Sequence, residues 1–274
     1  MAAFAANSIL CRLALDVYGI DPASFSLLRL ASGAVVLLFL VALLNQAKPS
    51  QLLAGEWRAS LFLAIYILGF SFAYITLDAG VGALILFSLV QLTMMAVALY
   101  EGERPAAIEW VGWVFALMGV LVLVAPGVSA PSPVGLLLMS LAGVAWAGYT
   151  LCGRKATQPL MSTSGNFIYA TIIVLIPCLI LMNLSSLSWQ GVMLAVASGA
   201  IASGVGYTIW YVVLPHISTM RAALVQLSVP VLAAVGGILF IGEAVAVRFM
   251  ISCALVLGGI ALAISYKNTS KDLS

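Results

Sequence analysis

The stretch PASFSLLRLASGAVVLLFLVALL, residues 22–44, contains a single charged residue, Arg29. A helix needs roughly 20 apolar residues to cross the hydrocarbon core of a bilayer, and this stretch supplies them. It follows Asp21, and Asp before Pro22 is typical of a helix N-cap with proline at the first helical position. We therefore expect a membrane-spanning helix here.

The rest of the chain has the same character: 64% of its 274 residues are hydrophobic, 7% are charged, and the mean hydropathy is +1.20. An average soluble domain has about 25% charged residues. Apolar runs bounded by Pro, Gly, Asn and charged residues fall at about 2–17, 22–44, 58–77, 80–100, 107–125, 134–153, 163–183, 190–213, 219–241 and 246–266. The sequence predicts an all-α membrane protein with ten transmembrane helices and no sizeable soluble domain.

The first run is the shortest, because Met1 to Leu15 rises only about 22 Å at 1.5 Å per residue. We expect the chain to begin within a helix or to be shortened at its N-terminus. A signal peptide is the alternative interpretation, but no basic segment precedes the apolar run, and Arg12 and Asp16 follow it directly.

The distribution of basic residues predicts the orientation. If the first helix runs outward, only Arg248 falls clearly outside. The basic residues that then face the cytoplasm are Lys48, Arg58, Arg104, Arg154, Lys155, Arg221, Lys267 and Lys271. This pattern predicts a multi-pass protein of the inner (plasma) membrane with both termini in the cytoplasm.

The two halves of the chain share residues at an offset of 140 positions. The pairs are Ala83 and Ala223, Leu84 and Leu224, Ser88 and Ser228, Gly102 and Gly242, Glu103 and Glu243, Leu117 and Leu257, and Gly119 and Gly259. Because five spans is an odd number, the second half must enter the membrane upside down relative to the first. We expect two inverted five-helix repeats, residues 1–126 and 134–267, an architecture that many secondary transporters use to alternate access.

The chain resembles the drug/metabolite transporter superfamily, in particular its EamA-type ten-helix permeases. The resemblance rests on Ala6-Asn7-Ser8 with Arg12, Arg29, Gly102-Glu103-Arg104, Gly143 to Tyr149, Ser228-Val229-Pro230 and Gly242-Glu243. It implies two EamA-like repeats and a transporter of small metabolites, which often exports amino acids or related compounds. Its substrate would be a small molecule, its surroundings the lipid bilayer, and a homodimer is left open.

Polar and aromatic side chains within the spans are the candidates for substrate binding, since an unpaired polar group in hydrocarbon costs free energy. The candidates are Asn7, Tyr74, Gln91, Trp146, Tyr149, Tyr207, Trp210 and Gln226. Trp146 and Tyr149 share a helix face, as do Tyr207 and Trp210, and Tyr66, Phe70 and Tyr74 share a third. The alternatives are hydrogen bonding between helices for the two glutamines, and interfacial anchoring or packing for the aromatic rings.

The gating or structural candidates are Arg12, Arg29, Glu103, Pro230 and Glu243. Pro230 is expected to kink its helix. Arg12 could pair with Asp16 at i, i+4, and Arg29 is close enough to the outer surface to extend its side chain there. Arg29 is interpreted as an anchor, with recognition of a substrate carboxylate as the alternative. Glu103 and Glu243 are expected to lock a gate, with ion coupling as the alternative.

No catalytic residue, metal site or cofactor is predicted. No carboxylate falls deep in a span, so we expect facilitated diffusion or exchange of a neutral or zwitterionic solute, without tight proton coupling. The four cysteines lie in apolar runs and do not indicate a disulfide or zinc framework, and a net charge of +2 without like-charge blocks argues against a nucleic-acid partner. An intramembrane enzyme, a channel and a non-transporting membrane subunit are the competing functions.

Overall fold

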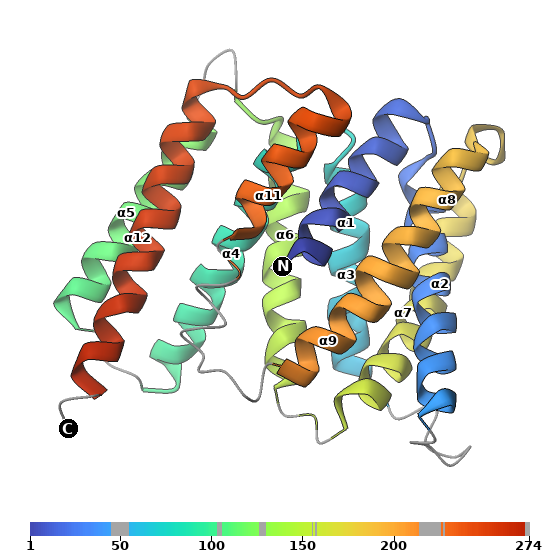
Figure 1. Cartoon of the computed structure of the whole chain (residues 1–274), viewed down its shortest axis with the longest axis horizontal. Coiled ribbons are helices and arrows are strands. Elements are labelled where there is room, and N and C mark those ends of the chain that lie inside the picture. The colour runs from blue at the N-terminus through green and yellow to red at the C-terminus, as the bar shows by residue number, and fades with distance from the viewer. Residues whose placement is uncertain are drawn as a thin grey trace.

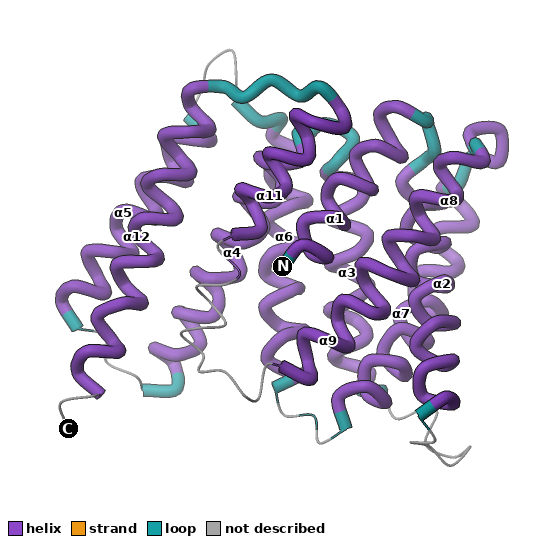
Figure 2. The backbone as a smooth tube through the Cα atoms, in the orientation of Figure 1, coloured by secondary structure: helices purple, strands orange, loops and turns teal. Residues whose placement is uncertain are grey.

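The computed structural model describes residues 1–44, 55–102, 106–125, 130–154, 156, 158–213, 226 and 228–271. Within these residues the regular elements are helices, with no strand (Figure 2). Six segments are long and apolar enough to cross a membrane. They are α2 (Pro22–Leu43), α4 (Ala79–Tyr100), α5 (Ala107–Val124), α6 (Pro133–Gly153), α7 (Pro159–Leu181) and the continuous run of α8 (Trp189–Ala197), η4 (Ser198–Val205) and α9 (Gly206–Val213).

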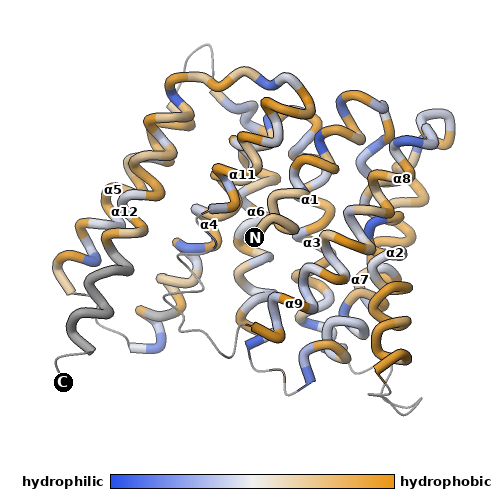
Figure 3. The backbone as a smooth tube through the Cα atoms, in the orientation of Figure 1, coloured by the Kyte–Doolittle hydropathy of each residue, from blue (hydrophilic) through white to orange (hydrophobic). Residues whose placement is uncertain are grey.

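Four further helical segments complete the correspondence with the predicted runs. They are α1 (Ala2–Arg12) continued by η1 (Leu13–Val17), α3 (Trp57–Ala73), α11 (Ser228–Gly236) continued by η6 (Gly237–Ile241), and α12 (Val247–Lys271). A short turn, η3 (Leu184–Ser186), precedes α8. Ten helical segments therefore lie where ten were predicted. Hydrophobic residues run along most of them, and strongly hydrophilic ones lie mainly near their ends (Figure 3).

The helix starts follow local sequence signals. Asp21 caps α2, accepting a hydrogen bond from the Ser24 amide at 2.8 Å, with Pro22 in the first turn. Ser132 does the same for α6, accepting from the Gly135 amide at 3.0 Å ahead of a proline. The predicted N-cap at Asp21 is confirmed.

The fourth and ninth predicted helices end in the same backbone conformation. Gly102 and Gly242 have φ of 90° and 78°, the left-handed region that ends a helix and that glycine adopts without a Cβ penalty. Each amide returns to a carbonyl of the preceding helix, Gly102 to Leu99 at 3.0 Å and Gly242 to Ile238 at 3.2 Å. The requirement for left-handed backbone explains why glycine stands at both positions.

Figure 1 shows how the helices are arranged. α5 and α12 pack against each other at one edge of the molecule, next to α4 and α11. The remaining helices form one bundle, in which α3 packs on α6 and α7, α2 packs on α7, α8 and η4, and α1 packs on η4. α4 and α11 join the two parts, since α4 contacts α6 and α11 contacts α1.

The contact between α2 and η4 depends on glycine. A Cβ on Gly199 would collide with the Arg29 carbonyl oxygen, and one on Gly33 would lie 3.1 Å from the Gly199 carbonyl oxygen. Small residues let membrane helices approach at backbone distance, where van der Waals packing holds them together. This close contact sets the position of Arg29 along η4.

Gly199→Ala tests that contact. The added methyl group meets backbone, which cannot rotate away, so we expect overpacking to cost about 1–3 kcal/mol and to lower the Tm of the purified protein. Gly258→Ala is the matched control, because no heavy atom lies within 4 Å of a Cβ built there. Equal Tm values for the two variants would contradict the close approach of α2 to η4.

Candidate functional site

Aromatic side chains from four helices meet in the centre of the bundle. The rings of Tyr66 and Trp146 lie 4.8 Å apart, and those of Trp146 and Tyr207 lie 5.0 Å apart. Phe4 of α1 packs edge-on against Trp146, Tyr207 and Trp210, with centroids 5.6–5.8 Å away. We call Phe4, Tyr66, Trp146, Tyr207 and Trp210 the aromatic cluster. The predicted single-face clusters of α3, α6 and α9 are therefore joined in space, and α1 contributes a ring as well.

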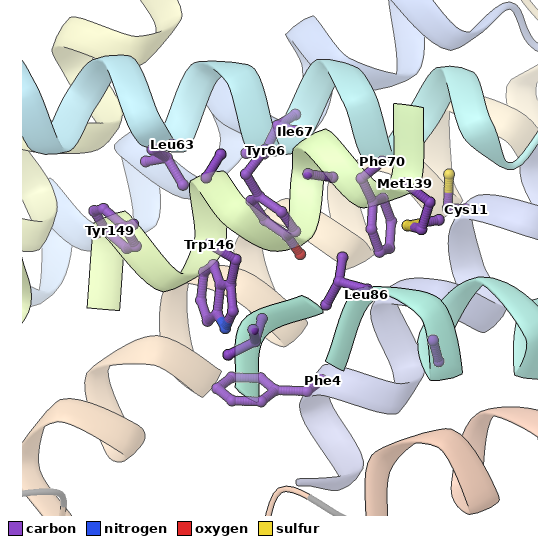
Figure 4. Close-up of a cluster of buried hydrophobic side chains, with 14 of the residues drawn as sticks. Phe4, Cys11, Leu63, Tyr66, Ile67, Phe70, Leu86, Met139, Trp146 and Tyr149 are labelled. Atoms are coloured by element: carbon purple, nitrogen blue, oxygen red, sulfur yellow. The ribbon is translucent and has the colours of Figure 1, made fainter. Parts of the chain in front are cut away.

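A small void lies inside this cluster. Its volume is about 10 Å³, roughly the space for one water molecule. Its lining residues are Phe4, Asn7, Ser8, Tyr66, Phe70, Ala83, Leu86, Phe87, Trp146 and Tyr207. Figure 4 shows Tyr66, Phe70 and Trp146 on one side of this region, and Phe4 and Leu86 on the other. The void touches α1, α3, α4, α6 and α9, so any relative movement of these helices changes its size.

Arg29 contacts residues that line the void. Its side chain is fully buried, with 0% of the residue exposed, so it does not extend to the surface as the sequence suggested. Nη2 donates to the hydroxyl oxygens of Tyr66 at 3.2 Å and Tyr207 at 3.3 Å. The guanidinium also lies over the Phe70 ring at 4.9 Å. The hydroxyl partners hold the cation in the interior of the helix bundle.

A chain of polar contacts continues from Arg29 to α1. Arg29 Nε donates to the Ser203 hydroxyl at 3.1 Å, and Ser203 donates to Asn7 Oδ1 at 3.2 Å. Ser198 donates to the same oxygen at 2.7 Å. Asn7, a predicted binding residue, is therefore oriented by two serines of η4, and its amide oxygen already has two donors.

A second cavity, of about 170 Å³, opens toward the face where α3 and α7 begin. Its lining includes Tyr149, Thr163, Asn166 and Tyr211, and the Tyr149 and Tyr211 rings lie 6.1 Å apart. The Tyr149 ring also lies 5.6 Å from Trp146. We call this space the Asn166 cavity; it leads toward the aromatic cluster along α6.

The opposite face is closed by an ion-pair cluster. Arg12 Nε lies 3.2 Å from Glu243 Oε1, and Arg12 also lies 3.4 Å from Asp16 and 3.8 Å from Asp78. The Glu243 carboxylate accepts the Ala79 amide hydrogen at the start of α4, at 2.9 Å. Arg12, Asp16, Asp78 and Glu243 form what we call the Glu243 cluster, which ties α1, α4 and the segment after η6 together.

Burial opposes the charge on Glu243. Burial raises the pKa of the Glu243 carboxyl above its ordinary value, and repulsion from Asp78 adds to this, while Ala79 and Arg12 act to lower the pKa. A cavity of about 420 Å³ lies beside this cluster, between α4, α11 and the start of α12. Its lining includes Glu243 and Asp78 but none of the predicted binding residues.

The structure separates the predicted binding residues into four groups. Asn7, Trp146 and Tyr207 line the central void, with Trp210 packed on Phe4, and Tyr149 lines the Asn166 cavity. Tyr74 lies with the Glu243 cluster, because its carbonyl oxygen accepts from Arg12 at 3.1 Å. Gln91 and Gln226 are buried, each 8% exposed, but line none of these three cavities.

The predicted gating residues have mixed outcomes. The Arg12 and Asp16 pair is confirmed, and Glu243 has the loop contacts expected of it. Glu103 lies outside the described residues, and the Pro230 kink stays a prediction because the described helix begins at Ser228. Sequence reasoning missed Ser203 and Asp78, and it placed Tyr66 only on an aromatic face. No local signal marks the partners of these side chains, since they lie on distant segments.

Comparisons with known proteins agree with this architecture. The sequence model of the EamA-like transporter family matches residues 133–265. A solved crystal structure superposes with a TM-score of 0.70 over 97% of both chains at 19% identity, which shows a shared fold.

Three relatives cover most of the chain. An uncharacterized protein of Pseudomonas aeruginosa is 46% identical over 96% of this chain and 91% of its own length. The threonine/homoserine exporter RhtA of Escherichia coli is 27% identical over 89% of this chain and 82% of its own length. A probable amino-acid metabolite efflux pump of Escherichia coli is 24% identical over 90% of this chain and 86% of its own length.

Because the apolar helices, the family match and these near-full-length relatives agree, the chain belongs to the EamA-like transporter family of the drug/metabolite transporter superfamily and is a multi-pass membrane transporter of small metabolites.

Proposed function

We propose that this transporter exports an amino acid or a related zwitterionic metabolite across the inner (plasma) membrane by alternating access. The proposal rests on the position of the aromatic cluster and the void inside it. The aromatic cluster is buried between the ion-paired Glu243 cluster on one side and the Asn166 cavity on the other. A site that is closed toward one face and approached by a cavity from the other is the geometry that alternating access requires.

The helix contacts support an inverted repeat, with residues 1–126 and 134–267 as its units. In such a repeat α1 corresponds to α6, α3 to the α8–η4–α9 run, and α4 to α11. The contact of α3 with α6 therefore corresponds to that of η4 with α1, and the contact of α4 with α6 corresponds to that of α11 with α1. All four contacts are present. Gly102 and Gly242 adopt the same left-handed conformation at equivalent helix ends. Rocking of one half against the other would then exchange which face is closed.

The direction of transport rests on charge distribution and on the relatives. Positive-inside orientation places the Asn166 cavity toward the cytoplasm, together with both termini, and the Glu243 cluster outside. The two Escherichia coli relatives are named as an exporter and an efflux pump for amino acids or their metabolites. A zwitterion also suits the central site, which offers a cation, hydroxyls and ring faces.

A transport assay tests the proposal. The purified chain is reconstituted in liposomes without an ion gradient and given labelled threonine, homoserine, purines, polyamines and a cationic dye. We expect saturable uptake of the amino acids, lost in Trp146→Ala and Trp210→Ala, because Trp146 lines the central void and Trp210 packs on Phe4. Trp189→Ala is the matched control, because this tryptophan of the same helical run is 73% exposed and faces away from the centre.

Three outcomes of that assay would contradict the proposal. Uptake that appears only when a proton or sodium gradient is imposed would mean that transport is coupled to that ion, and Glu103 and Glu243 would be the next residues to replace. Uptake restricted to purines or dyes would refute the substrate class. No uptake of any solute would favour a non-transporting membrane subunit.

Protonation of Glu243 should keep its face of the protein closed. Burial raises the pKa of this carboxyl in the closed structure, so the closed form binds the proton more tightly than a form in which the carboxyl reaches water. The stability contributed in this way is present at low pH and is lost as the pH rises through the folded pKa. The Arg12 contact acts in the opposite direction because it needs the carboxylate, but it does not return the pKa to its ordinary value. The open population should therefore increase as the pH rises.

Hydrogen exchange at the Ala79 amide measures this opening, since Glu243 protects that amide. After correction for intrinsic pH dependence, the protection factor should be highest under acidic conditions in the wild type and should fall as the pH rises. In Glu243→Gln, which keeps an uncharged acceptor in this place, the protection factor should not change with pH. A wild-type protection factor that stays constant or falls on acidification would refute the gate.

A further inference from the structure

The Arg29 guanidinium is a buried cation without a counter-charge. Among the described residues no carboxylate lies within 4 Å of it, and it donates hydrogen bonds to the hydroxyls of Tyr66, Tyr207 and Ser203. Nη1 is buried and has no hydrogen-bond partner. Burying an ion costs several kcal/mol unless an opposite charge and hydrogen bonds compensate, and an ionisable group within a membrane marks a functional site by default.

The two tyrosine hydroxyls connect this charge to the void. Tyr66 and Tyr207 both accept hydrogen bonds from Arg29 Nη2, and both line the void. The Tyr207 hydroxyl lies 3.5 Å from the Tyr66 hydroxyl and donates to it. The Tyr66 oxygen therefore accepts twice, which leaves its own proton for an acceptor in the void. A hydroxyl that accepts from a cation is also a stronger donor, because hydrogen bonds in a chain polarise one another.

The groups around the void that lack partners are donors. Trp146 Nε1 is buried and unpartnered, in addition to Arg29 Nη1. Asn7 Oδ1 already accepts from two serines, so the Asn7 amide nitrogen is the group left to face a ligand. A site with a positive charge and surplus donors selects an anion that accepts several hydrogen bonds.

We propose that the transported solute binds with its carboxylate in this void, against the Tyr66 hydroxyl and the Trp146 indole nitrogen, with Arg29 supplying the compensating charge. This inference rests on the proposed transport function and specifies its substrate class as α-amino or other carboxylic acids. The void of about 10 Å³ is the collapsed form of the site, and the carboxylate enters when α1, α4 and α9 separate. Release of the anion then leaves Arg29 with its tyrosine partners, as observed.

The test compares each acid with its carboxamide, which keeps the shape but removes the charge. Uptake of labelled threonine into wild-type proteoliposomes is measured in competition with unlabelled threonine, homoserine and threonine amide. We expect the amide to compete about ten- to a hundredfold more weakly than the acids, because a charge-assisted hydrogen bond is lost. This arm needs no variant, so it does not depend on how a substitution affects folding.

The variants place the carboxylate. Tyr66→Phe removes the hydroxyl, and Arg29→Gln removes the charge and shortens the side chain; each should raise the KM for threonine about tenfold or more and reduce the preference for the acid over the amide. Arg29→Lys should restore part of that preference. Arg58→Gln is the matched control, since Arg58 is exposed at the start of α3, and it should leave KM and preference unchanged.

The outcomes separate the two proposals. Threonine uptake with equal competition by acid and amide would overturn the carboxylate site and leave the transport function standing. So would Tyr66→Phe and Arg29→Gln variants that keep the wild-type KM and preference. Uptake by the wild type of carboxylate-free solutes alone would also overturn the site, and the absence of any uptake would overturn the transport function with it.

Discussion

Hydrocarbon offers no hydrogen-bond partner to a polar side chain, and this constraint organises the interior of the protein. Backbone groups are satisfied inside helices, so the polar side chains must find each other across helices. They do so in two networks. The Arg29 network joins α2, α3 and the η4–α9 run. The Glu243 cluster joins α1, through Arg12, to Glu243 and to the Tyr74 carbonyl oxygen. Both networks cross between the halves of the chain, so each depends on how the halves are packed.

The π-helical segments lie at these same polar contacts. η1 contains Asp16 and follows Arg12, η4 contains Ser198 and Ser203, and η6 ends just before Gly242 and Glu243. A π segment inserts an extra residue into a helix and is frequent at functional sites. Its wider turn lets η4 present two serines to Asn7 while Gly199 and Gly33 keep its backbone against α2. Helix irregularity and polar contact thus occur together, where a moving helix would have to change its hydrogen bonds.

The fold was largely predictable because its signals are local. Hydropathy located the ten helices, Asp21 with Pro22 marked a helix start, and the Gly-Glu pairs marked two helix ends. The site was less predictable, because its contacts span the chain: Arg29 bonds to Tyr207 across 178 positions, and Arg12 bonds to Glu243 across 231. The expectation that Arg29 would reach the surface failed because helix depth alone ignores hydroxyl partners on α3 and α9. Gln91 and Gln226 are polar and deep, but depth does not say which cavity a side chain faces.

The two networks differ in what they require of the protein. In the Glu243 cluster charges of both signs are present, so this face can close without a ligand and its strength depends on the ionisation of one half-buried carboxyl. In the Arg29 network the cation has only neutral hydrogen-bond partners among the described residues, so a bound anion would offset its electrostatic cost. A ligand shifts a conformational equilibrium only through its differential affinity for the two states. In the proposed carboxylate site the missing negative charge would provide that differential, because a carboxylate would stabilise the state in which it can reach Arg29 and its tyrosines.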